Sequence, residues 1–495
     1  MASLNAKVIW SEDLTDGIYI PKYYAKDIER QFEELSLTHD VYTLGYLMDE
    51  GVISASTGHE IGKAAYGTGD IPFIRTSDMS NWELKTVPKQ GVSKEIYNEY
   101  SKRQAVRVGD ILFVRDGTYL IGRNCIITEV DREVLFQSHV LKFSVLRPDL
   151  VDPYLLFLAL NSPLTQRHIR SKQFTADIID TLGQRVREIK IAIPHDGCAR
   201  ARLIEETSAA LRTRRDGKLL IKHFQTLMEE SLREGTVGPF EKFSKLTTEE
   251  QLAELKSSTI SNELGSFSAT VMPSTAVVNS IYIPKYYDRA IGTELDSLSE
   301  NCDLVSIGEL IDRRLLLAGS GVEPGKSAYG TGEIPFVRTS DFTNWELAAE
   351  SKQGVSEDIY DMYAGKAATQ PGDVLLVRDG TYLVGSSCIV TESDPRSIFC
   401  GGLIRLRSLD QAYLDPMLLL GLLNTVIVKK QFRSKQFTRD VIDTMGQRYR
   451  EVVLPIPKNP KFREQLSNIA REAVLSRVSG RTELVRLTQE VIAVD

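Results

Sequence analysis

Short apolar runs that end in turn residues dominate the first 194 residues. "DIPFIRTS" and "GDILFVRDG" are runs of this kind, and "VLKFSVLR" alternates apolar and polar positions. Such runs, bounded by Gly, Asp or Ser, are typical of strands. Two helix starts follow, at Asp152-Pro153 and Ser162-Pro163, because a capping side chain and a first-turn proline favour helix initiation. "VREIKIAIP" closes this zone as a strand that ends at Pro194.

Two later stretches carry the spacing of long amphipathic helices. About 35 helical residues would extend roughly 50 Å, which is long enough to separate two globular domains. Each stretch has a glycine at the same place, Gly217 or Gly480, so we expect each helix to be kinked or divided there. The apolar positions at near-heptad spacing are Leu203, Ala210, Leu220, Phe224, Leu227 and Leu232, then Phe462, Leu466, Ile469, Ala473, Val478, Leu484, Leu487 and Val491.

The chain repeats itself. "YGTGDIPFIRTSDMSNWEL" at Tyr66 returns as "YGTGEIPFVRTSDFTNWEL" at Tyr329, with 15 of 19 positions identical. "IYIPKYY", "KQGVS", "RDGTYL" and "SKQFT" also occur twice, and each pair is 263 residues apart. A period of this length indicates a duplicated domain, because solenoid repeats are only 20–50 residues long.

The duplication sets the domain organisation that we predict. One globular domain covers residues 1–198 and is followed by a helix over 199–234; the second covers 281–459 and is followed by a helix over 460–495. Residues 235–280 are rich in Ser and Thr, which is typical of a linker. Within this linker, "TTEEQLAELKSS" predicts a short helix in which Thr247 and Glu250 form a capping box.

The amino-acid composition narrows the class of protein to which the chain can belong. The 495 residues, 42% of them hydrophobic, allow sizeable cores. A net charge of −7 weakens a simple electrostatic case for nucleic acid but leaves local basic faces open. Five scattered cysteines without a CxxC pair fit reduced thiols, and no apolar run is long enough to span a membrane. We therefore expect a soluble cytoplasmic protein.

The order of these motifs resembles the specificity (S) subunit of type I restriction–modification systems. The matching elements are "IPFIRTSDM" at Ile71, "GDILFVRDGTYLIG" at Gly109, and "YLLFLALNSP" at Tyr154 leading to "IKIAIP" at Ile189. "FREQLSNI" at Phe462 resembles the entry to the helical spacer of that family, and the likeness covers nearly the whole chain. The departures are "PHDGCARARL" after the closing strand of the first half and the long linker.

The resemblance implies an α+β fold of two tandem homologous halves. Each half would be a strand-rich target recognition domain followed by a long helix, and the two helices would pair antiparallel. In that family each recognition domain reads one half of a split double-stranded DNA site, and the helices dock two methyltransferase subunits, which restriction and translocase subunits can join. The S subunit has no catalysis of its own, so we expect no cofactor and no metal. A doubled chain would match a DNA site with two halves.

The residues that we expect to contact DNA lie in the repeated loops and in the basic clusters "QRHIRSKQF" and "KKQFRSKQFTR". Arginine offers parallel N–H donors to guanine or phosphate, and hydroxyl side chains suit phosphate contacts. These residues are Arg75, Thr76, Ser77, Lys89, Arg115, Thr118, Tyr119, Arg167, Arg170, Lys172, Arg338, Thr339, Ser340, Lys352, Arg378, Thr381, Tyr382, Arg433, Lys435 and Arg439.

Each group has a structural alternative. Arg75 could form a salt bridge with Asp78 instead of contacting DNA. Arg115 stands next to Asp116 in "RDGTY", where a turn stabilised by aspartate is the favoured interpretation. The basic clusters could be a phosphate footprint or a solvated helix face. Trp82 and Trp345 are expected to pack in the core, because a duplex reader has little use for base stacking.

The sequence contains no recognisable catalytic motif. "YGTGD" precedes a strand and therefore offers no helix N-terminus to a phosphate, and the aspartates that flank the repeated strands fit turn positions. The alternative to a DNA reader is a pseudo-twofold scaffold that pairs two identical partner subunits without binding DNA. A nuclease is disfavoured because no metal or cofactor motif is present. We further hypothesise that shared loops contact the DNA backbone, while stretches that differ between the copies, such as "LFQSHVLKFS" and "IFCGGLIRLR", tune base choice.

Overall fold

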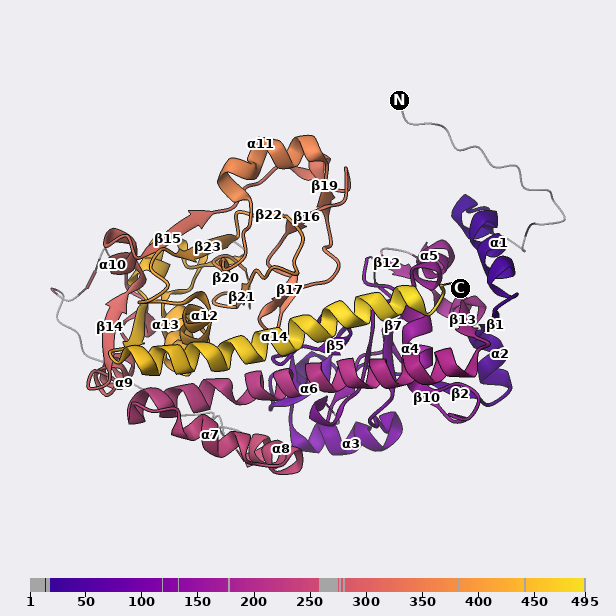
Figure 1. Ribbon diagram of the computed structural model, residues 1–495, viewed down its shortest axis with the longest axis horizontal. Coiled ribbons are helices and arrows are strands. Elements are labelled where there is room, and N and C mark those ends of the chain that lie inside the picture. The colour runs from indigo at the N-terminus through magenta and orange to yellow at the C-terminus, as the bar shows by residue number, and fades with distance from the viewer. Residues whose placement is uncertain are drawn as a thin grey trace. The chain divides into compact units, whose positions relative to one another are not determined.

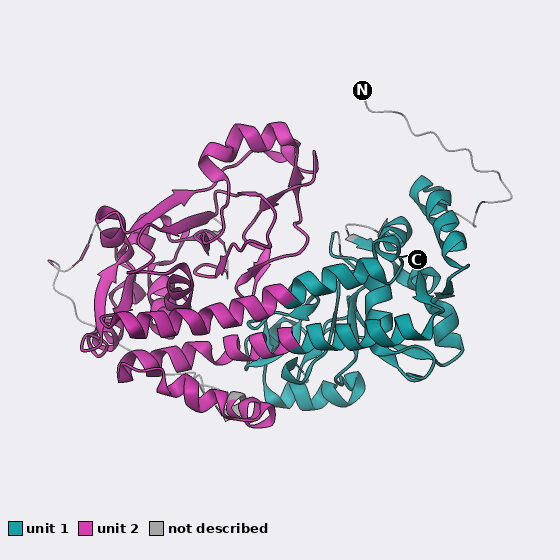
Figure 2. Ribbon diagram, in the orientation of Figure 1, with its two compact units in different colours: residues 1–212, 480–495 teal, residues 213–479 magenta. Residues whose placement is uncertain are grey.

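The computed structural model describes residues 14, 18–117, 119–131, 133–176, 179–257, 275, 277–278, 281–380, 383–439 and 442–493. The chain forms two compact units (Figure 2), residues 1–212 with 480–495 and residues 213–479. Both boundaries fall inside the long helices α6 and α14 (Figure 1), so each unit contains one globular portion and a segment of each helix.

The first globular portion is built mainly from short strands around a few short helices. Its helices are α1 (Lys26–Leu35), α2 (Leu44–Asp49), α3 (Lys94–Gln104), α4 (Pro153–Asn161) and α5 (Pro163–Lys172). Its strands are β1 (His39–Thr43), β2 (Ile53–Thr57), β3 (Ile71–Ile74), β4 (Met79–Ser80), β5 (Glu83–Leu84), β6 (Gly91–Val92), β7 (Ile111–Val114), β8 (Asn124–Ile126), β9 (Leu135–Phe136), β10 (Val140–Val145), β11 (Phe174–Ala176), β12 (Ile179–Thr181) and β13 (Lys190–Pro194).

The core of this portion is a four-stranded antiparallel sheet in the order β2-β10-β7-β8. In its register, Phe143 lies opposite Ala55 on one side and Ile111 on the other. All four residues of β7 are buried, which explains why "ILFV" is a continuous apolar run and not an alternating one. A smaller sheet, β6-β3-β9, pairs β3 antiparallel with β6 and parallel with β9.

Both helix starts predicted from proline and a preceding capping residue are confirmed. The Asp152 side chain accepts a hydrogen bond from the backbone N–H of Tyr154 at 2.7 Å, and α4 begins at Pro153. Ser162 caps α5 in the same way through the N–H of Thr165 at 3.3 Å. Because "LLFLAL" in α4 is buried all round, this helix lies inside the core.

The second globular portion repeats this plan 263 residues later. Its main sheet has the order β15-β23-β20-β21 and its smaller sheet the order β19-β16-β22. The helices are α9 (Arg289–Asp296), α10 (Ile307–Asp312), α11 (Glu357–Ala367), α12 (Pro416–Leu423) and α13 (Val426–Lys435). The strands are β14 (Cys302–Ser306), β15 (Leu316–Ser320), β16 (Ile334–Val337), β17 (Phe342–Thr343), β18 (Glu346–Leu347), β19 (Gly354–Val355), β20 (Val374–Val377), β21 (Ser387–Ile389), β22 (Ile398–Phe399), β23 (Leu403–Ser408), β24 (Phe437–Arg439), β25 (Ile442–Thr444) and β26 (Val453–Pro457).

A strained hairpin is copied in both halves. Asn81 and Trp82 join β4 to β5 with φ values of 50° and 63°, and Asn344 and Trp345 join β17 to β18 with 49° and 72°. Left-handed backbone at both loop positions is the geometry of a type I′ turn, in which the second position usually holds glycine. Trp345 is buried and Trp82 packs against the core of its unit, so the prediction that both rings are core residues is confirmed.

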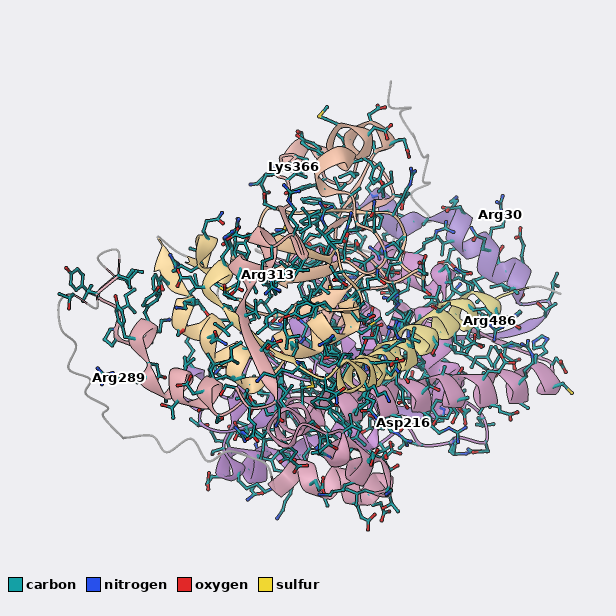
Figure 3. All side chains as sticks on the ribbon, turned by 60° about the vertical axis from the view of Figure 1, so that its left-hand side comes forward. Arg30, Asp216, Arg289, Arg313, Lys366 and Arg486 are labelled. Carbon is teal, nitrogen blue, oxygen red and sulfur yellow. The ribbon has the colours of Figure 1, made fainter. Side chains whose placement is uncertain are left out.

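The two long helices pair antiparallel within each unit. They are α6 (Gly197–Glu234) and α14 (Pro460–Glu490). In unit 1, Arg202 of α6 forms an ion pair with Glu490 of α14, and Glu206 forms one with Arg486, which is labelled in Figure 3. From Arg202 to Glu206 the chain advances along α6, while the partners step back along α14 from Glu490 to Arg486, so the two helices run antiparallel. The last turns of the chain therefore belong to the same hydrophobic core as the first half: Leu484, Leu487 and Val491 are fully buried there.

In unit 2 the same pair of helices meets around Gly217. A Cβ at this glycine would lie 2.9 Å from Cγ of Arg477 and 3.1 Å from the carbonyl oxygen of Ala473. The expectation that Gly217 and Gly480 divide the helices is wrong, because both helices continue through these positions. Gly217 instead permits close approach of the two helices. The predicted apolar stripe is largely buried, except that Leu220 and Ile469 are half-buried while their neighbours Leu219 and Ala470 are buried.

Two short helices follow α6 on the linker side, α7 (Gly238–Ser244) and α8 (Thr248–Ser257). The predicted capping box is confirmed: the backbone N–H of Thr247 donates to Glu250 at 2.8 Å, and the N–H of Glu250 donates to the Thr247 hydroxyl at 3.3 Å. No helix in the described residues is long and apolar enough to cross a membrane.

Candidate nucleic-acid interface

The motifs that recur most faithfully in the sequence come together in each half. In the first half, the "RDGTY" turn lies against the β11–β12 hairpin, since the N–H of Gly117 donates to the carbonyl of Asp180 at 2.9 Å and the Thr181 hydroxyl donates to the Asp116 carboxylate. In the second half, the N–H of Gly380 donates to the carbonyl of Asp443 at 2.9 Å. We call the segments 58–60, 75–77, 115–117, 137–139, 174–176 and 179–181, with 321–323, 338–340, 378–380, 400–402, 437–439 and 442–444 of the second half, the loop cluster.

Arg115 is a structural residue of this cluster. Its guanidinium donates two hydrogen bonds to one oxygen of Asp116, at 2.9 and 2.7 Å, and a third to the carbonyl of Ser138 at 3.3 Å. Burial disfavours the charged form of Asp116, but the hydrogen bonds from Arg115 and Thr181 outweigh it and hold the pKa of this carboxyl below its usual value. The favoured interpretation of "RDGTY" as an aspartate-stabilised turn is therefore confirmed.

The second half repeats this arrangement. Arg378 donates to Asp379 at 2.9 and 2.7 Å and to the carbonyl of Gly401 at 2.7 Å. The guanidinium groups of Arg115 and Arg378 therefore both stabilise the turn through hydrogen bonds. The residues that follow were expected at the DNA: Tyr119 is exposed, while Thr118, Thr381 and Tyr382 lie outside the described residues.

The salt bridge considered for Arg75 is replaced by a different contact. Asp78 is buried, and its two carboxylate oxygens accept from the backbone N–H groups of Arg75 at 3.0 Å and Lys89 at 3.1 Å. Burial raises the pKa of Asp78. Within the described residues the half-buried Arg75 guanidinium has no hydrogen bond and no ion pair. Asp78 therefore shapes the loop, and the guanidinium of Arg75 is available to a ligand.

Arg338 stands in the same position in the second half. Its backbone N–H donates to Asp341 at 3.0 Å, and its guanidinium lies 5.8 Å from the centre of the Tyr329 ring. The hydroxyl residues beside both arginines follow the same plan: Thr76 and Ser77 are half-buried in a single 3-10 turn, and Thr339 is half-buried beside the exposed Ser340. Among the two lysines of the "KQGVS" motif, Lys89 is exposed and Lys352 half-buried.

The basic cluster of the first half is largely engaged in ion pairs. Arg167 contacts Asp27 of α1 at 2.7 Å, and Lys172 is buried 3.3 Å from Glu188. The ammonium of Lys172 also lies 3.8 Å from the centre of the Tyr23 ring. Arg170 is exposed. Arg167 and Lys172 therefore form ion pairs within their own half, and contact of these two side chains with DNA stays a prediction.

The second basic cluster shows the same division. Lys435 contacts Glu451 at 3.0 Å and lies 3.9 Å from the Tyr286 ring, and Lys430 contacts Glu294 at 2.6 Å. Arg433 is exposed. Arg439 belongs to β24, and the placement of its side chain is outside the described residues. Lys435 therefore forms an ion pair within its own half and Arg433 is exposed, and contact of both side chains with DNA stays a prediction.

The sequence reasoning missed the segment "IYIPKYY", which it noted as a repeat without giving it a role. Tyr23 packs 5.7 Å from the Phe174 ring of the β11–β12 hairpin, and its hydroxyl donates to Glu188 at 2.6 Å. The guanidinium of Arg185, in "GQR", lies 4.0 Å from the centre of the Phe174 ring. This anchored segment presents Tyr19, 79% exposed, and the exposed Lys22 to solvent. The signal was available in the exact repetition of its three tyrosines.

The aspartates that flank the repeated strands have partners inside the fold. Asp110 accepts from the N–H of Arg107 at 2.8 Å and from Ser144 at 2.6 Å, and Asp373 binds the guanidinium of Arg407 at 2.6 and 2.9 Å. Across the described ranges, no group of three or more His, Cys, Asp or Glu side chains is arranged to hold a metal ion. The loop cluster therefore combines hydrogen-bond donors, hydroxyls and positive charge with the carboxylates of Glu60 and Glu323.

Comparison with known proteins gives structural neighbours only. No family model and no curated protein matches the chain. The S subunit of a type I restriction–modification system from M. genitalium is 13% identical, with 92% of this chain and 96% of that chain covered and a TM-score of 0.34. The chain resembles type I S subunits. The HsdS subunit from Thermoanaerobacter tengcongensis is 16% identical over 92% and 95% of the two chains, with a TM-score of 0.26.

A third neighbour comes from work on complex assembly and conformational transition of the type I restriction–modification system. It is 15% identical, covers 92% of this chain and 96% of that chain, and has a TM-score of 0.27.

Proposed function

We propose that this chain is the specificity subunit of a type I restriction–modification complex. In this role it reads a bipartite double-stranded DNA site, docks methyltransferase subunits and, in complexes that restrict, the restriction subunits, and performs no catalysis itself. The observation that carries the proposal is the duplicated loop cluster. Two copies of one framework, each with an arginine whose guanidinium makes no hydrogen bond and no ion pair within the described residues, suit a ligand that is itself composed of two comparable halves.

The chemistry of each cluster fits duplex DNA. Arg75 and Arg338 follow strands β3 and β16 directly and can offer a bidentate fork to guanine or to a phosphate. Thr76 and Ser77, with their equivalents in the second half, add hydroxyl donors beside the fork. The exposed Arg170 and Arg433 supply positive charge for the backbone although the whole protein carries a net charge of −7.

The helices support the partner part of the proposal. Helix α6 has 38 residues and α14 has 31, so each runs far beyond the globular portion from which it starts. Paired antiparallel helices of this length fix a spacing and offer side-chain faces on which other helical subunits can pack. Two methyltransferase subunits and the restriction subunits are the partners that this proposal assigns to them.

The decisive experiment compares adenine methylation across the genome in cells with and without this gene. Long-read sequencing should detect a split motif of two short half-sites that is methylated only when the gene is present. The motif would identify both half-sites at once. Methylation that is identical in the two strains, with the partner methyltransferase expressed from a plasmid, would contradict the proposal.

A scaffold that pairs two partners without touching DNA gives a different result. Such a protein would still co-purify with its methyltransferase partners, but substitution of Arg75 and Arg338 would leave methylation unchanged. The two measurements together therefore separate DNA recognition from partner assembly.

A further inference from the structure

A short turn in each half has matching backbone hydrogen bonds but different side chains in the two halves. In the first half it covers residues 137–139 and closes with a hydrogen bond from the N–H of Val140 to the carbonyl of Gln137 at 3.0 Å. In the second half it covers residues 400–402 and closes at the same 3.0 Å distance, from Leu403 to Cys400. We call both segments the reading turn.

The backbone of the reading turn is held in the same way in both halves. The N–H of Gln137 donates to the carbonyl of Ile74 at 2.9 Å, and the N–H of Arg115 donates to the carbonyl of His139 at 3.0 Å. The equivalent distances, from Cys400 to Val337 and from Arg378 to Gly402, are both 2.9 Å. The reading turn is thus fastened to the strand that carries Arg75 or Arg338 and to the arginine–aspartate pair. Its position is conserved between the halves by these contacts, while its side chains change.

The side chains of the first reading turn are polar. The Ser138 hydroxyl donates to the carboxylate of Glu60, and Nδ1 of His139 lies 3.3 Å from Asp116. Both Ser138 and His139 are half-exposed, and Glu60 is exposed. Because the serine fixes only one oxygen of Glu60, the carboxylate is oriented and still able to accept a hydrogen bond from a ligand.

The second reading turn has glycines at both of these places. Gly401 donates its backbone N–H to Glu323 at 2.9 Å, so a carboxylate is fixed here as well, without a side-chain hydroxyl. Gly402 has no counterpart of the imidazole. Cys400, which replaces Gln137, is buried.

The backbone does not require these glycines. Neither Gly401 nor Gly402 has a positive φ. A Cβ at Gly401 would lie 3.0 Å from the flexible carboxylate of Glu323, and a Cβ at Gly402 would lie 3.2 Å from a methyl group of Thr339. The first half accommodates two full side chains on the same framework. The glycines therefore remove two side chains from this turn, and a Cβ at either position would require a small shift of the Glu323 or Thr339 side chain.

We propose that the reading turn determines how the two half-sites differ. The inference rests on the proposed function and adds the residues that make the discrimination. In both halves a fixed carboxylate, Glu60 or Glu323, accepts from an exocyclic amino group of a base, because a carboxylate repels phosphate and matches the cytosine N4 donor. In the first half, His139 and Ser138 add direct contacts to a neighbouring base pair. In the second half, Gly401 and Gly402 present no side chain to the base edge, so this turn does not discriminate between bases at that position.

The test exchanges the two turns within the full-length chain, in the complex with its methyltransferase. The variants are S138G/H139G and G401S/G402H, and the readout is the methylated motif in cells together with enrichment from a randomised duplex library. S138G/H139G should reduce the preference at one or two base pairs of the first half-site by about tenfold or more, while the second half-site stays as it is. G401S/G402H should create a new preference at the equivalent position of the second half-site.

Matched controls exchange an exposed pair outside the loop cluster. Glu99 in α3 and Met362 in α11 are equivalent and exposed, so E99M and M362E test whether any surface exchange alters the motif. Both controls should keep the wild-type motif. Thermal melting of the purified complex shows whether each variant folds; if a double exchange does not melt cooperatively, the single variants H139G and G402H take its place.

The outcomes separate two failures. If the folded exchange variants methylate the wild-type motif unchanged, the reading turn does not determine specificity, although the proposed function stands. If the wild-type complex methylates no split motif and enriches no sequence from the library, the proposed function itself fails. An exchange in one half of the protein could instead change the base preference in the DNA half-site that is read by the other, unmodified half. That result would also overturn the inference.

Discussion

Arg214 and Arg477 occupy equivalent positions in the two long helices, and each donates a hydrogen bond to the backbone carbonyl of the other. The distances are 2.7 Å from Arg214 to the Arg477 carbonyl and 3.3 Å in the reverse direction. Both guanidinium groups are buried and share one carboxylate, that of Glu346, at 2.7 and 3.0 Å. A position duplicated in the sequence thus becomes a reciprocal contact between helices α6 and α14 inside unit 2.

Glu346 should be the most sensitive single position of this contact. Substitution of Glu346 by Gln would leave two buried guanidinium groups without their counter-charge and should reduce the free energy of unfolding by about 3–5 kcal/mol. Chemical denaturation of the purified protein measures this loss. Glu309→Gln is the control, because Glu309 makes an exposed i,i+4 pair with Arg313 at 3.4 Å and should change stability by about 0.5 kcal/mol or less. A loss below about 1 kcal/mol for E346Q would contradict the assignment.

Arg75 and Arg115 should separate binding from stability. Arg75→Ala removes a guanidinium that has no partner within the described residues, so it should weaken binding to duplex DNA and lower the slope of log Kd against log salt by about 1, with an unchanged melting temperature. Arg115→Ala removes three hydrogen bonds and should destabilise the protein by about 1.5–3 kcal/mol. Fluorescence anisotropy with salt titration and thermal melting give the two readouts. Equal destabilisation by both substitutions would refute this division of roles.

Two glycine-to-alanine substitutions should have opposite effects. At Gly217 a Cβ would lie 2.9 Å from Cγ of the buried Arg477, so G217A should destabilise the protein although alanine favours helix. At Gly292, inside helix α9, nothing lies within 4 Å of the added Cβ, and G292A should stabilise by about 0.5–1 kcal/mol. The midpoints of urea unfolding test both. If G217A proves as stabilising as G292A, the helices do not approach closely at this glycine.

Lys429 should make stability depend on pH. Burial, with the charge of Arg433 adding to it, lowers the pKa of Lys429 to about 7 from its usual value near 10.5. The folded state therefore binds fewer protons than the unfolded state between these two values, and stability should rise with pH across that window. The amine donates to the carbonyl of Gly385 at 2.5 Å. In the first half, Gln166 makes the equivalent hydrogen bond to Gly122 at 3.2 Å, so a neutral amide fits this place.

The matched variant is therefore K429Q. It should be more stable than the wild type near pH 6 and lose this advantage as the pH rises from 7 towards 10. Differences in melting temperature between the two proteins, measured at several pH values, cancel the titration of groups that both share. A difference that does not vary with pH would show that Lys429 titrates normally.

The amino-acid sequence by itself determined the local elements and the duplication. Prolines, capping residues and short apolar runs act over a few neighbouring residues, which is why the start of α4 at Pro153 and the buried strand β7 could be predicted. The constant spacing of 263 residues revealed two copies without any knowledge of contacts. The same local logic identified Asp116 as a partner for Arg115, because the two residues are adjacent.

Only the tertiary structure decided which charged side chains are occupied. Asp78 lies three residues from Arg75, but the carboxylate turns to backbone N–H groups and leaves the guanidinium without a partner in the described part of the chain. Lys172 looked like part of a phosphate footprint, but it is buried between Tyr23 and Glu188, residues 149 positions before it and 16 after it. Gly217 looked like a helix break, but it is a point of close approach to α14. Each of these outcomes depends on a partner that the chain brings in from another element, and local sequence patterns do not contain that information.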